Sequence, residues 1–207
     1  MSFRSFSILS SLLLTFGLSL SSAEALVRLD QTNINIAIKY GIQNQGSLAN
    51  VLGPNWIEGE NGVLVNVYSP FMLIASMAAK KGAPDDSPQS VKDVRKKMTR
   101  VISYNTDPNE PQQVKFATAL MGNSPDFANH VKARIEGMGR GKVVSLRPIK
   151  TFYDKVADLV AGVSGKYDGV NAYYFYYKDL ENLDRFQFIL TSPDGETVIN
   201  IDNHNLY

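Results

Sequence analysis

A run of five aromatic residues, Tyr173 to Tyr177, is the part of the sequence best suited to binding chemistry. Successive side chains of a β-strand point to opposite faces of a sheet, so Tyr173, Phe175 and Tyr177 share one face. We expect this face to be open and to hold Arg185 of the following strand beside Tyr177. Exposed rings beside a guanidinium group suit a sugar, a peptide or another flat ligand.

The opposite face of the same strand is expected to belong to the core. If residues 179–183 form the connection, Tyr176 lies opposite Phe186 and Tyr174 lies opposite Phe188. A shift of one residue in this register exchanges the two faces completely. In the alternative interpretation both faces are covered, because aromatic residues are common in ordinary strands.

A second candidate is the basic face of a helix predicted to begin at Ser87-Pro88. Apolar residues form a stripe from Val91 to Ile102, and basic side chains lie on the opposite side. Such a face can dock on anionic lipid, a polysaccharide or an acidic partner, although a solvated surface is the simpler interpretation. The basic residues are Lys92, Arg95, Lys96 and Arg100.

Residues with the chemistry of catalysis are sparse. Glu58 and Glu60 lie on or beside a predicted hairpin, and a pair of carboxyl groups is what glycoside hydrolysis needs. The chain has no cysteine, and its two histidines, His130 and His204, lack the spacing of a zinc site. No G-x-S-x-G motif marks a serine nucleophile. We therefore expect neither a metal nor a cofactor.

Strands are predicted from alternating patterns early in the chain. Ile34, Ile36 and Ile38 alternate with Asn and Ala, which predicts a half-buried strand. Residues 56–58 and 63–68 flank Asn61-Gly62, a dipeptide that tolerates the positive φ of a tight turn, so they predict a hairpin.

Helices are predicted where a capping hydroxyl precedes a proline. Ser69-Pro70, Ser87-Pro88 and Ser124-Pro125 each combine an N-cap with a proline at the first helical position. The first predicts a helix over 70–81, and the third predicts one that ends near 139. A fourth helix is expected from Thr151, because Asp154 completes a capping box.

The last quarter of the chain changes to strands. Segments 170–178, 184–192 and 196–202 predict three successive strands, with a turn at 192–195 that contains Pro and Gly. Shorter strands are predicted at 114–121 and 143–146. These elements predict an α+β fold, with a largely antiparallel sheet, a C-terminal three-strand meander and about four helices packed on it.

The first 25 residues have the pattern of a secretory signal peptide. Arg4 precedes an apolar run over 8–20, and Ala23-Glu24-Ala25 presents the small-x-small pattern before a cleavage site. The run is shorter than the roughly 20 residues that a membrane-spanning helix needs. We therefore expect a signal peptide over 1–25, export to the periplasm or beyond, and a single soluble domain over 26–207 without a transmembrane segment.

Composition narrows the expected function further. The net charge of +1 indicates no general attraction to nucleic acid. The favoured hypothesis is a non-catalytic binding or accessory module that meets a glycan, a peptide or an anionic envelope component. The alternatives are a small exported hydrolase that uses carboxylates and a structural, envelope-associated domain.

Overall fold

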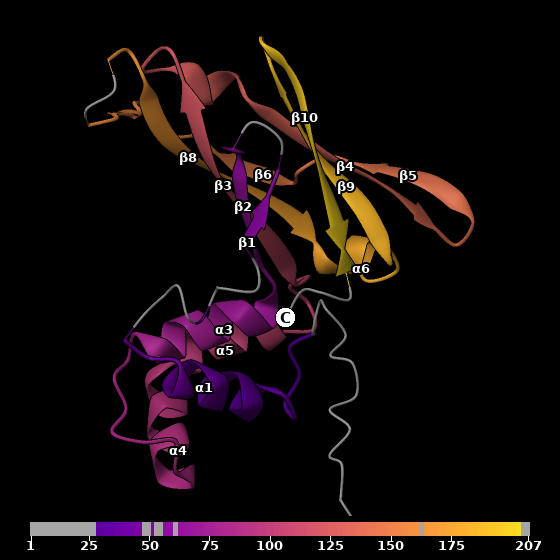
Figure 1. Cartoon of the computed structure of the whole chain (residues 1–207). Coiled ribbons are helices and arrows are strands. Elements are labelled where there is room, and N and C mark those ends of the chain that lie inside the picture. Colours follow the sequence, from indigo (N-terminus) through magenta and orange to yellow (C-terminus); the bar gives the residue numbers. More distant parts are fainter. Residues whose placement is uncertain (1–27, 47–50, 52–55, 60–61, 162–163, 204–207) are drawn as a thin grey trace, which may run out of the picture.

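Two antiparallel sheets and a cluster of helices make up the structure, a computed structural model that describes residues 28–46, 51, 56–59, 62–161 and 164–203 (Figure 1). The segment predicted to be a signal peptide lies outside these residues. Five α-helices and ten strands are found in the described part of the chain. The α+β class, the antiparallel sheets and the C-terminal meander of three strands are confirmed.

The first sheet has the order β1-β2-β3-β8-β6, and β7 pairs with β8 beside β6. Its central pair, β3 and β8, is antiparallel over ten residues on each strand. The strands are β1 (Trp56–Glu58), β2 (Leu64–Tyr68), β3 (Gln113–Gly122), β6 (Lys150–Phe152), β7 (Asp158–Leu159) and β8 (Tyr167–Tyr176).

The second sheet has the order β10-β9-β4-β5 and lies against one face of the first. Apolar side chains from both sheets meet in one core, where the rings of Phe116 and Phe188 stack with centroids 4.8 Å apart. The other face of the first sheet is therefore its outer face. The strands of the second sheet are β4 (Lys132–Gly139), β5 (Lys142–Leu146), β9 (Arg185–Ser192) and β10 (Gly195–Asp202).

Four helices gather at one end of the sheets around a second apolar cluster (Figure 1). Ser69 and Ser87 cap two of them as predicted: their hydroxyls accept hydrogen bonds from the backbone N–H groups of Met72 and Ser90. The four helices are α1 (Ile34–Gln43), α3 (Pro70–Ala79), α4 (Pro88–Lys97) and α5 (Thr99–Thr106). A short helix, α6 (Tyr177–Leu180), follows β8. Within the described ranges, no helix combines the length and the apolar character needed to cross a membrane.

The strand predicted around Ile34 to Ile38 is wrong, because these residues begin α1. In the turn that precedes the helix, Asp30 accepts hydrogen bonds from the backbone N–H groups of Thr32 and Asn33. Ile34, Ile38 and Ile42 are buried at intervals of four residues, whereas Ile36 is exposed. The spacing of the isoleucines fits both an alternating strand and a helix, and the burial of every fourth residue identifies it as a helix.

The helix predicted after Ser124-Pro125 is wrong as well. A single 3₁₀ turn (Phe127–His130) is followed by β4. The Ser124 hydroxyl bonds to the Asp126 side chain at 2.7 Å, so it does not cap a helix. The second half of the segment instead pairs with β5 and β9.

The helix predicted from Thr151 is replaced by β6 and β7. Asp154, the expected partner in a capping box, accepts a hydrogen bond from the backbone N–H of Val170 on β8. This segment thus pairs with the edge of β8, and the tertiary pairing outweighs the local preference for a capped helix.

The three C-terminal strands lie close to their predicted bounds, but their predicted pairing is wrong. The chain leaves the first sheet after β8 and enters the second sheet with β9. Tyr174 pairs with Lys115 and Lys150, not with Phe188, and Tyr176 pairs with Gln113, not with Phe186. The turn between β9 and β10 is confirmed, with Gly195 at a φ of 133°.

Candidate functional site

The aromatic face that we expected to be open is part of the core. Tyr173, Phe175 and Tyr177 are only 0%, 1% and 8% exposed, so the prediction of an exposed face is wrong. Arg185 is not beside them: it lies on the second sheet, is largely exposed, and pairs with Asp202 at 3.3 Å. The face of β8 that we assigned to the core, which carries Tyr174, is the outer one.

The four basic residues of the predicted helix face are divided between two helices, because α4 ends before Met98 and α5 begins at Thr99. Lys92 and Lys96 are exposed on α4. Arg95 bonds to the side-chain oxygens of Asn35 and Gln31, which hold α4 against the start of α1. Arg100 stands on α5 and faces a cavity beside the first sheet.

Four residues form a line across the strands on the outer face of the first sheet, and we call them the cation–aromatic row. Tyr68 on β2 is the register partner of Lys115 on β3, Lys115 is the partner of Tyr174 on β8, and Tyr174 is the partner of Lys150 on β6. Aromatic rings and ammonium groups therefore alternate along the row.

The ammonium groups of the row lie over aromatic rings. The Nζ atom of Lys115 lies 3.6 Å from the centroid of the Tyr68 ring. The Nζ atom of Lys150 lies 4.4 Å from the centroid of Phe152 and 5.8 Å from that of Tyr174. Phe152 in turn contacts Tyr174 edge-on, with centroids 5.7 Å apart. These contacts orient the cations along the surface without neutralising their charge.

A cavity of about 410 Å³ opens above one end of this row, where the sheet meets the helices. Its floor is formed by three residues of the row, and its wall by α3, α5 and the connection from α5 to β3. No carboxylate is found among the described residues that line it. The lining consists of Tyr68, Leu73, Arg100, Val101, Tyr104, Asn105, Pro111, Gln112, Gln113, Lys115 and Tyr174.

The electrostatics of the cavity centre on Lys115. Burial lowers the pKa of the Lys115 ammonium, and the nearby charge of Lys80 lowers it further. In the part of the chain that the structure describes, Lys115 forms no ion pair. Burial also raises the pKa of the Tyr68 and Tyr174 hydroxyls, so both rings stay neutral at physiological pH.

This arrangement is suited to binding an anion that carries a flat or apolar body. An unpaired, half-buried ammonium gains an ion pair when a carboxylate, sulfate or phosphate enters, and Arg100 adds planar donors at the cavity wall. The rings of Tyr68, Tyr104 and Tyr174 supply apolar surface for the rest of the ligand.

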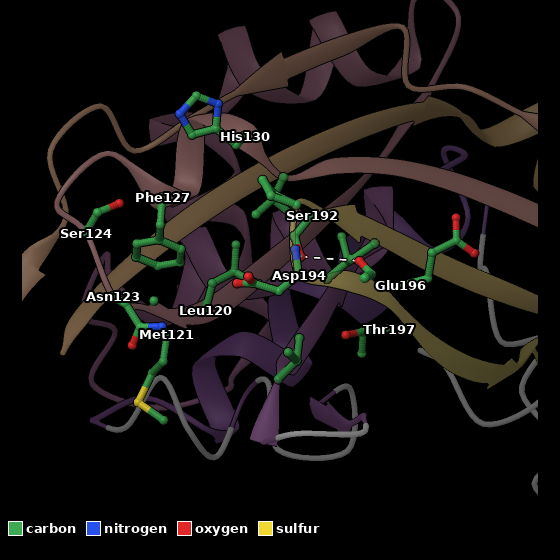
Figure 2. A pocket seen from close by; sticks show the side chains of 16 residues that line it. Leu120, Met121, Asn123, Ser124, Phe127, His130, Ser192, Asp194, Glu196 and Thr197 are labelled. Atoms are coloured by element: carbon green, nitrogen blue, oxygen red, sulfur yellow. Dashed lines mark hydrogen bonds between the residues drawn. The ribbon is translucent and has the colours of Figure 1, made fainter.

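A second cavity, of about 540 Å³, lies between the end of β3, the 3₁₀ turn and the turn from β9 to β10 (Figure 2). Several of its polar side chains already have partners. Asn123 accepts a hydrogen bond from Lys166 at 2.7 Å, and Glu196 forms an ion pair with Arg134 at 2.7 Å.

Ser124 and His130 of this second cavity do not form a nucleophile and its base. Both side chains reach the carboxylate of Asp126, Ser124 at 2.7 Å and the His130 Nε2 atom at 3.5 Å. The Ser124 hydrogen bond is the main reason that the pKa of Asp126 is lowered. A catalytic serine must donate to the imidazole, whereas here the carboxylate lies between them.

The carboxylate pair gains no support from the structure. Glu58 is exposed on β1, and Glu60 lies outside the described residues. In the described ranges, no group of three His, Asp or Glu side chains could hold a metal ion. A comparison with protein-family models finds no match, and neither does a comparison with curated proteins.

Sequence reasoning identified two of the residues at the site and missed the others. Tyr174 belongs to the aromatic run and Arg100 to the predicted basic face, but neither was expected to face the other. Lys115 and Lys150 were missed. Lys115 did leave a signal, because it is the one charged residue in the largely apolar strand predicted over 114–121.

Proposed function

We propose that the chain is a non-catalytic binding module that holds an anionic ligand on the cation–aromatic row. The observation that carries this proposal is Lys115: its ammonium is half-buried, lies over the Tyr68 ring and forms no ion pair within the described residues. An unpaired charge in such a place costs folding free energy, and an anionic ligand offsets that cost.

The surroundings of Lys115 support an anion in particular. Arg100 lines the same cavity, Lys80 acts on Lys115 through its charge, and Lys150 continues the row. The positive potential of these groups adds up at one place on a chain whose net charge is only +1. The neighbouring rings then select anions that also bring apolar surface.

The proposal is tested by titrating the protein with 8-anilinonaphthalene-1-sulfonate, an aromatic sulfonate whose fluorescence rises on binding. We expect Lys115→Gln to weaken binding at least about tenfold, because a hydrogen bond to a charged group contributes roughly 1.5–3 kcal/mol. Lys92→Gln is the matched control: it removes the same charge from an exposed site on α4.

Equal affinity of the wild type and Lys115→Gln would refute the proposal. Absence of binding by the wild type would refute it too and would favour the structural, envelope-associated alternative. A loss of affinity in both lysine variants would show that net charge, not the cavity, governs binding.

We also propose that the module works outside the cytoplasm, in the periplasm or the extracellular space. The support for this setting is the apolar run over 8–20 followed by Ala23-Glu24-Ala25. N-terminal sequencing of protein from the native host is expected to begin near Leu26. Cytosolic protein that retains Met1 would contradict the setting and leave the binding proposal intact.

A further inference from the structure

The two lysines of the cation–aromatic row stand on alternate strands. Lys115 is on β3 and Lys150 is on β6, with Tyr174 of β8 between them. Since neighbouring strands lie about 4.8 Å apart, the backbones at Lys115 and Lys150 are separated by about 10 Å. The row therefore offers two lysines with an aromatic residue on the strand between them, along a line perpendicular to the strands. The Lys115 ammonium itself lies over the Tyr68 ring on β2, and the Lys150 ammonium lies over Phe152.

The row beside it has two small side chains at its centre. It runs from Asn66, which is buried, through the register partners Ala117 and Ala172 to Phe152 at the edge of the sheet. The two alanines have short side chains, and the Phe152 ring is 51% exposed. A ligand that crosses the strands thus rests on small side chains, with rings at its side.

We propose that the ligand is a linear acidic oligosaccharide that lies across the strands of the first sheet, with carboxylates of alternate sugars at Lys115 and Lys150. This inference rests on the proposed function and extends it to a substrate class. The apolar C–H face of the intervening sugar packs on the Tyr174 ring, and Arg100 receives a further acidic group at the cavity end.

The alternation of cations and rings favours a sugar acid over an acidic peptide, because one sugar residue carries both a carboxylate and an apolar C–H face that packs on an aromatic ring. Single-stranded nucleic acid also combines stacking with charge, but it needs a more basic groove than a chain with a net charge of +1 provides.

The inference is tested by calorimetric titration with hexamers of galacturonate, mannuronate and hyaluronan, and with the methyl-esterified galacturonate hexamer as the uncharged control. We expect at least one acidic hexamer to bind at least tenfold more tightly than its monomer, and esterification to abolish the binding of the galacturonate hexamer if that is the ligand. Lys150→Gln is expected to weaken hexamer binding about fivefold, as for an exposed ion pair.

The variants separate this inference from the proposed function. Lys92→Gln, on the exposed face of α4, should leave both affinities unchanged, whereas Lys115→Gln should weaken both ligands. Lys150→Gln should weaken the hexamer more than 8-anilinonaphthalene-1-sulfonate, because Lys150 does not line the cavity at Lys115. Failure of all three acidic hexamers, or an unaltered hexamer affinity in Lys150→Gln, would overturn the glycan assignment. A poly-glutamate decamer or an oligothymidylate that binds more tightly than the acidic hexamers would overturn it as well. In each of these cases, sulfonate binding that still depends on Lys115 would leave the proposed function intact.

Discussion

Replacement of Tyr173 by Phe tests the reassignment of the aromatic strand most directly. The Tyr173 hydroxyl donates a hydrogen bond to the Val131 carbonyl at 2.8 Å and accepts one from the Asn171 amide at 3.0 Å. Asn171 also donates to the Ala128 carbonyl and accepts from the Asp154 backbone N–H. This buried network joins β8 to the 3₁₀ turn and to the segment after β6.

The expected loss of stability follows from the buried group that the substitution leaves without a hydrogen-bond partner. Phe keeps the ring and creates no cavity, but the Val131 carbonyl loses its bond from the hydroxyl. A buried acceptor without a partner costs about 1–3 kcal/mol. For a domain of this size, each 1 kcal/mol lowers the melting temperature by about 2–4 °C. We expect Tyr173→Phe to melt roughly 2–12 °C below the wild type.

The adjacent tyrosine provides a matched control. Tyr174 points to the outer face, is half-buried, and makes no hydrogen bond through its hydroxyl in the described part of the chain. Tyr174→Phe should therefore change the unfolding free energy by less than about 0.5 kcal/mol. Urea denaturation followed by circular dichroism measures both variants, and a sulfonate titration at low temperature measures binding.

Two results would refute this reasoning. Equal stability of Tyr173→Phe and Tyr174→Phe would mean that the Tyr173 hydroxyl contributes nothing to the core. Loss of ligand binding in Tyr173→Phe at unchanged stability would mean that Tyr173 contacts the ligand, as the sequence first suggested.

Alkaline pH gives an independent measure of the same site. Burial raises the pKa of Tyr173 well above its ordinary value of 10.0, so the neutral phenol is favoured in the folded chain. Its contribution is fully present below pH 10 and is lost as the pH rises toward the folded-state pKa. The unfolding free energy of the wild type should thus fall more steeply above pH 10 than that of Tyr173→Phe.

Three further substitutions test the helices and the site. In Gly41→Ala, the added Cβ would lie 2.1 Å from the Ala75 carbonyl oxygen on α3. We therefore expect chemical denaturation to show an unfolding free energy lower by about 1–3 kcal/mol. Ile36→Ala, at an exposed position of the same helix, is the control and should change the unfolding free energy little. Ser69→Ala removes the cap of α3 and should cost about 1 kcal/mol in the same assay; an unchanged midpoint would show that the cap is dispensable. Lys115→Met should melt at or above the wild-type temperature, because the lowered pKa of Lys115 indicates that folding disfavours its charge. The difference in melting temperature between the two proteins should narrow as the pH rises toward 10.5, where the lysine of the unfolded chain loses its proton. A lower melting temperature of Lys115→Met at neutral pH would contradict the cost assigned to the charge.

Predictions from short sequence patterns are correct where both partners of an interaction lie close together in the chain. The hydroxyls of Ser69 and Ser87 cap helices within three residues, so the sequence contains both partners of each bond. The same Ser-Pro pattern failed at Ser124, where a nearby acceptor, Asp126, takes the hydroxyl. The pattern also contains no sign that the following segment pairs with β9, roughly 50 to 60 residues later.

The face of the aromatic strand could not be predicted because its partner is remote. Alternation correctly separates Tyr173, Phe175 and Tyr177 from Tyr174, but it does not say which set is buried. That choice depends on β3, which pairs with β8 and places Phe116 beside Phe175 in the core. Pairing the strand with its neighbour in sequence therefore exchanges the two faces.

The alternation that misled the prediction also explains how one strand can serve the core and the site. Odd-numbered residues from Asn171 to Phe175 lie on the face of β8 that meets the second sheet, where buried rings and hydrogen bonds hold the strand in place. Tyr174, between them, is thereby held on a rigid backbone while its ring faces outward. Tyr174 is thus positioned by residues that do not line the cavity. If the proposed function is correct, substitutions on the buried face of β8 should alter stability and those on the outer face should alter binding. A binding surface on a β-sheet gains this separation from the two-residue period of the strand, which a helix with its continuous range of side-chain directions does not offer.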